Sequence, residues 1–122
     1  MSAFPQNAQL KIDHNQPVPL DAIHAVAQRI VEKFTPEKII LFGSYANGNP
    51  QASSDVDLLV VMKTDLTPRA QRLQIARTIS PRPFGLDILV RTPTDLERRI
   101  ALGDFFLREV VKKGKAIYER SH

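Results

Sequence analysis

The chain has 122 residues, of which 43% are hydrophobic and 25% are charged, and these proportions fit one globular domain and exclude a disordered chain. It has no cysteine, which excludes disulfides, thiolate nucleophiles and zinc sites with sulfur ligands. The net charge of +4 is concentrated in residues 63–122, where 13 basic and 7 acidic side chains indicate either an acidic or phosphate-bearing partner or a solvated surface rich in arginine.

The first 18 residues are polar and aperiodic, and they predict a loose N-terminal arm or an edge strand around Gln9–Ile12. Residues 19–122 are expected to form a single domain. Its first element is a helix, because apolar residues recur at helical spacing from Leu20 to Phe34 before a Thr-Pro pair ends the run.

Strands and helices then follow one another to the end of the chain. Short apolar runs predict strands at Lys38–Phe42, Val56–Met62, Phe84–Val90 and Ala116–Tyr118. Apolar spacing and capping residues predict helices over Thr67–Ile79, from Thr92 to a break at Gly103, and over Asp104–Lys113. Residues 44–54 are rich in turn-forming residues. The order predicts an α/β (α+β) domain with a small mixed sheet of three to five strands and helices packed on one side.

Two aspartates, Asp55 and Asp57, stand at the beginning of the second expected strand. Residues two apart on a strand point to the same face, with Cα atoms about 6.6 Å apart. Two carboxylates placed in this way repel each other unless a cation lies between them. Oxygen ligands of this kind suit Mg²⁺, which completes its coordination with water and substrate phosphate. The alternative is an ordinary solvent-exposed pair that follows a turn.

A glycine and a serine, Gly43 and Ser44, follow the first expected strand, and ten residues separate Ser44 from Asp55. Glycine at a strand end lets the backbone approach a ligand, and the N–H groups of a following helical turn attract anions. A Gly-Ser pair alone is more often a simple turn. Combined with the aspartates, it predicts a phosphate site beside a metal site.

A third carboxylate, Asp87, lies between two apolar residues of the third expected strand, where a buried charge needs a partner. A metal ion held by the first two aspartates would be such a partner. An ion pair with Arg82 or Arg91 is the alternative. Asp65 is the rival third carboxylate, although its sequence context predicts a turn.

These segments resemble the DNA polymerase beta-like nucleotidyltransferase superfamily, through ILFGSYANG, a ten-residue gap, SSDVDLLVV and the later LDILV. The short length and the ending FFLREVVKKGKAIYE resemble its minimal members, the MNT family. The resemblance runs from about Ile23 to Glu119. It implies the polymerase beta-like nucleotidyltransferase fold and a transfer reaction that uses ATP and two Mg²⁺ ions.

The resemblance also implies a role for each motif residue. Gly43 and Ser44 would bind the triphosphate, Asp55 and Asp57 would bind both Mg²⁺ ions, and Asp87 would bind the catalytic metal near the acceptor hydroxyl. One position departs from the family pattern, because Asn47 stands where members often carry arginine. Arg82, Arg91 or a side chain of a partner would then have to supply the missing positive charge.

Minimal nucleotidyltransferases that resemble this chain are often paired with a HEPN-type ribonuclease toxin, which they silence by transferring AMP to a tyrosine. This antitoxin activity is the expected function, and the short length with no acceptor domain agrees with a protein partner. Three alternatives stay open: an antitoxin that masks its partner without catalysis, a transferase with a small-molecule acceptor, and a scaffold that binds nucleic acid. Aromatic residues do not alternate with basic ones as in single-strand binders, so nucleic acid is not the expected main partner.

The longest apolar runs, such as Leu58–Met62, are too short to span a membrane, and the N-terminus lacks the pattern of a signal peptide. With cysteine absent, these features predict a cytoplasmic protein without a membrane partner.

Overall fold

The computed structural model describes residues 15–121. The strand expected around Gln9–Ile12, and most of the expected arm, lie outside these residues. The elements are, in chain order, α1 (Leu20–Phe34), β1 (Lys38–Phe42), the short 3-10 helix η1 (Gly43–Tyr45), β2 (Val56–Val61), α2 (Pro68–Thr78), β3 (Leu86–Arg91), α3 (Pro93–Ala101), α4 (Phe105–Lys113) and β4 (Lys115–Glu119). The described part of the chain has no helix with the length and apolar content to cross a membrane.

The four strands form one mixed sheet in the order β3-β2-β1-β4. β1 pairs antiparallel with both β2 and β4, whereas β2 and β3 are parallel. α2 supplies the crossover that a parallel pair needs, because strands that run in the same direction cannot be joined by a tight turn. Four strands and four α-helices confirm the expected α+β class and the number of strands.

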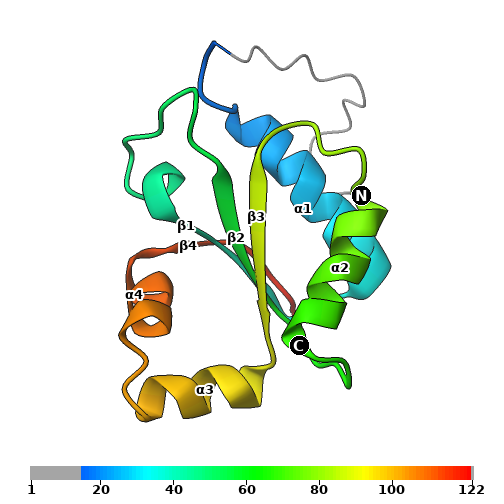
Figure 1. The fold of residues 1–122 in the computed structure, drawn as a ribbon, viewed down its shortest axis with the longest axis vertical. Helices are drawn as coiled ribbons and strands as arrows, with labels where there is room; N and C mark the ends of the chain where they lie inside the picture. Colours follow the sequence, from blue (N-terminus) through cyan, green and yellow to red (C-terminus); the bar gives the residue numbers. More distant parts are fainter. Residues whose placement is uncertain (1–14, 122) are drawn as a thin grey trace.

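The larger core lies between the sheet and the two helices α1 and α2. Every second residue of β2 points into it, and Val56, Leu58 and Val60 are fully buried there. Ile23 and Ile30 of α1 meet these strand residues, as the helical spacing of the sequence requires. Figure 1 shows α1 and α2 on the same side of the sheet.

The opposite face of the sheet is also covered, which corrects the expectation of helices on one side only. Val110 of α4 packs against Ile40 of β1 and Leu59 of β2, and Leu96 of α3 lies at the margin of this second cluster. In Figure 1, α3 and α4 lie across the sheet from α1 and α2. The physical reason lies in β2, whose continuous apolar run provides an apolar surface on both faces.

The two short helices on this second face begin at capped residues. The side chain of Thr92 accepts a hydrogen bond from the N–H of Asp95 at 3.1 Å, and Asp104 accepts one from the N–H of Leu107 at 3.0 Å. Such caps satisfy backbone donors that the first helical turn leaves free. The sequence also predicted a helix that starts at Thr92.

Gly114 connects α4 to β4 and allows α4 to lie close to β1. A Cβ at this position would meet the carbonyl oxygen of Val110 and the Cγ2 of Ile40, and would lie 3.0 Å from the carbonyl oxygen of Leu41. Its φ of −72° is accessible to any residue, so the requirement for glycine comes from packing and not from backbone strain.

We therefore expect Gly114→Ala to lower the free energy of unfolding by about 1–3 kcal/mol, as overpacking does elsewhere. Urea denaturation followed by circular dichroism measures this change. Lys115→Ala, at the next and exposed position, is the matched control and should change stability by less than about 0.5 kcal/mol. Equal midpoints for the two variants would show that α4 does not need its close approach to β1.

Candidate active site

Strand register places Asp57 and Asp87 side by side. They are directly opposite each other in the parallel pairing of β2 with β3. Their sequence neighbours, such as Leu58 and Ile88, are buried in the core under α1 and α2. Because side chains alternate along a strand, both carboxylates point to the other face of the sheet. Asp87 is exposed there, because β3 is an edge strand. The expectation that Asp87 would be a buried charge is therefore wrong.

Asp55 completes the group just before β2 begins, and the chain that leads into β3 makes room for it. A Cβ at Gly85 would overlap the Oδ1 of Asp55 and lie 3.1 Å from its Cγ. The N–H of Val56 donates to the carbonyl oxygen of Gly85 at 3.0 Å, which joins the two strand beginnings. Gly85 thus lets the Asp55 carboxylate lie against the backbone of the neighbouring strand.

Gly43 plays the corresponding part on the other side of the site. β1 runs antiparallel to β2 with Phe42 opposite Asp57, so the end of β1 lies beside the beginning of β2. A Cβ at Gly43 would overlap the Oδ2 of Asp57. Gly43 also has a φ of +76°, a backbone conformation that residues with a Cβ rarely adopt. Glycine is therefore required here for two reasons: the turn needs a positive φ, and the Asp57 carboxylate occupies the space of a Cβ.

The turn that begins at Gly43 is held in place at both ends. The N–H groups of Ala46 and Asn47 both donate to the carbonyl oxygen of Gly43 at 3.1 Å. The ring of Tyr45 packs against the main core, and its hydroxyl accepts a hydrogen bond from the N–H of Val18 at 2.9 Å. Tyr45 is thus a packing residue, and it holds the η1 turn, which includes Ser44, against the core.

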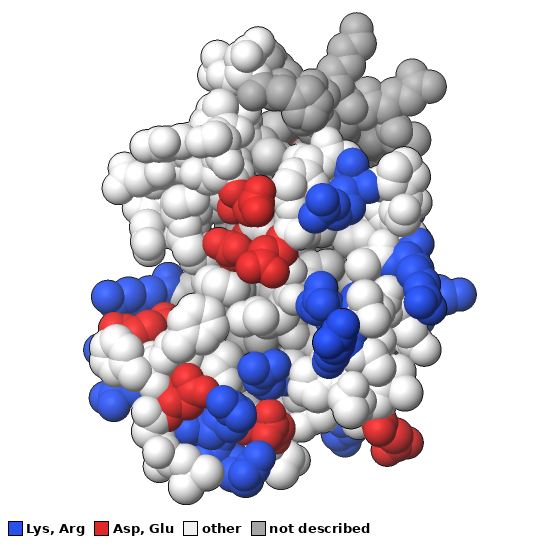
Figure 2. All heavy atoms as spheres, viewed as in Figure 1, with Lys and Arg blue, Asp and Glu red and all other residues white. Residues whose placement is uncertain are grey.

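The three carboxylates interact electrostatically. Partial burial raises the pKa of Asp57 above its ordinary value of 3.8, and the negative charges of Asp87 and Asp55 raise it further. Figure 2 shows acidic side chains gathered over the beginnings of β2 and β3, with basic side chains to the right of them and below. A cation bound among these carboxylates would remove the repulsion that raises this pKa.

The chemistry of these groups fits a magnesium ion. Among residues 15–121, no group of three or more His, Cys, Asp or Glu side chains stands ready to hold a metal ion. The donors are nevertheless carboxylate oxygens, which Mg²⁺ prefers, and Mg²⁺ needs only one or two of them when phosphate and water complete its coordination. The residues present therefore fit the ion that the resemblance implies, and their metal-binding role stays a prediction.

The structure separates the rival residues from this group. Asp65 follows the far end of β2 and is exposed, so at least four residues of strand, about 13 Å, lie between it and Asp57. Arg91 lies at the far end of β3, where its Nη1 donates to the carbonyl oxygen of Val90 at 2.8 Å. No ion pair within the described chain joins Asp87 to Arg82 or Arg91, the two arginines that were its alternative partners.

Of those two arginines, Arg82 lies nearer the carboxylates. Its Nη1 donates to the carbonyl oxygen of Leu86 at 3.2 Å, one residue before Asp87. Asn47 is exposed and lines a pocket between the η1 turn and α4, together with Lys113. Sequence reasoning missed both Gly85 and Lys113. A glycine directly before an expected strand was a signal for Gly85, whereas nothing local in the sequence marks Lys113.

Comparison with known proteins agrees with the class that this fold and site define. A mixed sheet that presents a Gly-Ser turn beside three carboxylates is an arrangement suited to nucleotidyl transfer. Residues 25–122 match the family described as "Polymerase beta, Nucleotidyltransferase". The chain belongs to this family, which confirms the superfamily indicated by the sequence motifs.

A solved structure supports the fold. A protein from Sulfolobus solfataricus, described as a "putative nucleotidyltransferase", is similar to the chain with a TM-score of 0.60 and 21% sequence identity. The similarity covers 83% of this chain and 80% of that one. At this identity the likeness concerns the fold alone. No curated protein sequence matches the chain.

The raised pKa of Asp57 generates a prediction about stability. A carboxyl group whose pKa is raised by folding stabilises the folded state below its unfolded pKa and loses that contribution as the pH rises through the folded pKa. In the presence of a chelator at neutral pH, Asp57→Asn should therefore raise the free energy of unfolding. The gain should be on the order of 1 kcal/mol or less, because the carboxyl group keeps part of its contact with water.

Urea denaturation between pH 3 and pH 8 measures this gain, which should shrink as the pH falls toward 3.8, the ordinary pKa of the group. Asp65→Asn is the matched control, since Asp65 is exposed and far from the other carboxylates, and it should be as stable as the wild type at neutral pH. A loss of stability in Asp57→Asn at neutral pH would show that the carboxylate has a structural role.

Proposed function

We propose that the protein is a Mg²⁺-dependent nucleotidyltransferase that transfers AMP from ATP to a tyrosine hydroxyl of a partner HEPN-type ribonuclease toxin, and so acts as an antitoxin. The observation that carries the transferase part is the meeting of Asp55, Asp57 and Asp87 at the same end of the sheet as the Gly43–Ser44 turn. Membership of the nucleotidyltransferase family supports it. The toxin partner is supported by the resemblance to minimal nucleotidyltransferases.

Each site residue has a defined task in this proposal. The backbone at Gly43 allows close approach of the triphosphate, and the Ser44 hydroxyl donates a hydrogen bond to a phosphate oxygen. Asp55 and Asp57 hold Mg²⁺, and Asp87 adds a ligand on the side of the acceptor. When bound, a pair of Mg²⁺ ions supplies activation of the attacking hydroxyl and neutralises charge on the leaving group.

The reaction is an in-line displacement at the α-phosphorus of ATP. The acceptor oxygen forms a bond to phosphorus, the bond from phosphorus to the bridging oxygen breaks, and its electron pair leaves with pyrophosphate. The proton of the acceptor hydroxyl passes to a carboxylate of the site or to water. A tyrosine hydroxyl has an ordinary pKa of about 10, so it needs this activation at neutral pH.

An apolar surface on α3 and α4 supports a protein acceptor. Leu102, Phe105 and Phe106 expose 76%, 69% and 55% of their surface, which is a high concentration of large apolar groups for two short helices. Phe106 also packs edge-on against Phe42, the strand neighbour of Asp57, with ring centroids 5.9 Å apart. The exposed apolar surface thus reaches the site. The excess of basic residues in 63–122 favours an acidic partner.

Two alternative functions, a non-catalytic antitoxin and a transferase with a small-molecule acceptor, are each favoured by one observation. The absence of the family arginine at Asn47 favours an antitoxin that binds its partner without catalysis. The exposure of Asp55 and Asp87 also admits a small-molecule acceptor. The cytoplasmic location expected from the sequence stays a prediction.

Binding of ATP is expected to require Mg²⁺, because the carboxylates repel the triphosphate unless a cation lies between them. Titration calorimetry with ATP, with and without Mg²⁺, measures this dependence. The double variant Asp55→Asn and Asp57→Asn should remain folded and lose the Mg²⁺-dependent heat. Equal heats in the presence and absence of Mg²⁺ for the wild type would contradict the site.

Transfer itself is tested by incubating the protein with ATP, Mg²⁺ and a candidate HEPN-type ribonuclease. One or more AMP units should be added to a tyrosine-containing peptide of the partner, seen by mass spectrometry. Asp87→Asn should abolish the mass increments and still bind ATP, because Asp87 lies on the acceptor side of the site.

Two other outcomes of this experiment would contradict the proposal or a part of it. Neutralisation of the partner without any increment identifies the masking antitoxin. Increments that persist in Asp87→Asn would show that the reaction does not need the Asp87 carboxylate.

A further inference from the structure

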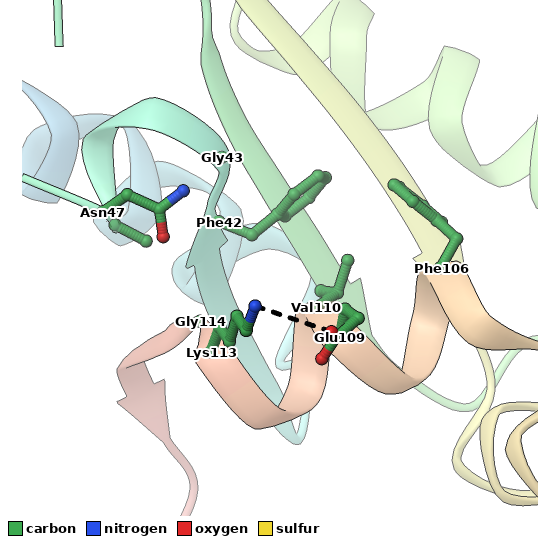
Figure 3. A pocket seen from close by; sticks show the side chains of 9 residues that line it. Phe42, Gly43, Asn47, Phe106, Glu109, Val110, Lys113 and Gly114 are labelled. Atoms are coloured by element: carbon green, nitrogen blue, oxygen red, sulfur yellow. Dashed lines mark ion pairs between the residues drawn. The ribbon is translucent and has the colours of Figure 1, made fainter. Parts of the chain in front are cut away.

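A pocket lies between the η1 turn and α4, next to the carboxylates. One wall is apolar and is formed by Phe42, Phe106 and Val110, and the other carries Asn47 and Lys113 (Figure 3). Its volume of about 190 Å³ is below the range of about 300–1,000 Å³ that is usual for a whole ligand. It is therefore suited to one part of a larger ligand whose remainder lies outside.

The position of the pocket relative to the carboxylates indicates which part. Asp87 is on β3, Asp57 is on β2 and Gly43 ends β1, so the three follow one another across neighbouring strands. Gly43 is also part of the pocket wall. The pocket is therefore the next feature after β1 in this direction across the sheet. An in-line displacement needs the attacking and leaving oxygens on opposite sides of the phosphorus. With the acceptor on the Asp87 side, the leaving pyrophosphate is on the side of Gly43 and the pocket.

A pyrophosphate in this position needs positive charge. Of the described residues that line the pocket, Lys113 alone carries one. Its Nζ lies 3.5 Å from the Oε1 of Glu109, one helical turn earlier, and the Lys113 side chain is 66% exposed. Figure 3 shows Asn47 on the side of the pocket near Gly43, and Lys113 beside Gly114 with its amino group directed toward Glu109. An exposed pair of this kind is weak and is easily exchanged for a stronger anion.

We propose that Lys113 binds the β- and γ-phosphates of ATP and then the leaving pyrophosphate, with Glu109 holding the lysine side chain beside the pocket when the phosphates are absent. Lys113 thereby supplies the positive charge that Asn47 does not. This inference rests on the proposed nucleotidyl transfer and adds to it a phosphate-binding residue on α4, from outside the motif that contains the Gly-Ser turn and the aspartates.

The test uses inorganic pyrophosphate and ATP as separate probes, each with Mg²⁺, in titration calorimetry on the full chain. Lys113→Gln should weaken pyrophosphate binding about threefold to tenfold, as loss of a charge-assisted contact with phosphate does. Lys113→Arg should retain most of the affinity. Lys112→Gln is the matched control, because Lys112 is the exposed neighbour that does not line the pocket, and it should bind like the wild type.

Glu109→Gln separates phosphate binding from a purely structural role. Both Lys113→Gln and Glu109→Gln remove the same ion pair, so a structural role predicts the same effect in both. Phosphate binding by Lys113 predicts opposite effects: weaker pyrophosphate binding in Lys113→Gln, and equal or tighter binding in Glu109→Gln, where no carboxylate competes for the lysine.

The failures of the inference and of the proposed function are distinguishable. If the wild type binds Mg²⁺-ATP and Lys113→Gln binds pyrophosphate as Lys112→Gln does, the role of Lys113 is overturned while the transferase site stands. A wild type that binds neither ATP nor pyrophosphate in the presence of Mg²⁺ would overturn both.

Discussion

The register of β2 against its two neighbours is the constraint on which the site depends. Parallel pairing with β3 places Asp57 opposite Asp87, and antiparallel pairing with β1 places Phe42, and hence Gly43 after it, beside Asp57. A shift of one residue in either pairing would turn a carboxylate toward the core or carry the Gly-Ser turn away from it. The buried face of β2 prevents such a shift, since Val56, Leu58 and Val60 would then leave the core.

The repulsion between the three carboxylates destabilises the fold, and the exposure of two of them to water limits this effect. Three carboxylates at neighbouring strand beginnings repel one another, and burial and this repulsion together raise the pKa of Asp57. Asp55 and Asp87 are exposed, and only Asp57 is partly withdrawn from water. The apolar cluster under α4 begins further along the same face, at Leu59. On β2, this face therefore carries a carboxylate at its beginning and packed apolar residues after it.

The sequence was sufficient for the elements and for the residues that carry charge, because these depend on local patterns. Apolar runs located β1, β2 and β3, and the spacing of two aspartates at a strand beginning predicted that they share a face. It was not sufficient for the placement of α4, because an apolar helix face does not indicate which side of a sheet it will cover. The exposure of Asp87 was missed for a related reason, since an edge strand is recognised only once the strand order is known.

Gly85 and Lys113 show a further limit of local reasoning. Gly85 accommodates a carboxylate that lies thirty residues earlier in the chain, and Lys113 lines the same pocket as a turn that lies seventy residues earlier. Both relations exist only because α2 returns the chain parallel to β2 and because Gly114 lets α4 lie against β1. α4 therefore joins two properties of the molecule. Its first turn exposes the apolar residues of the proposed partner surface, and its last turn carries the lysine of the proposed phosphate contact. A partner docked on this helix would therefore lie beside the proposed nucleotide site.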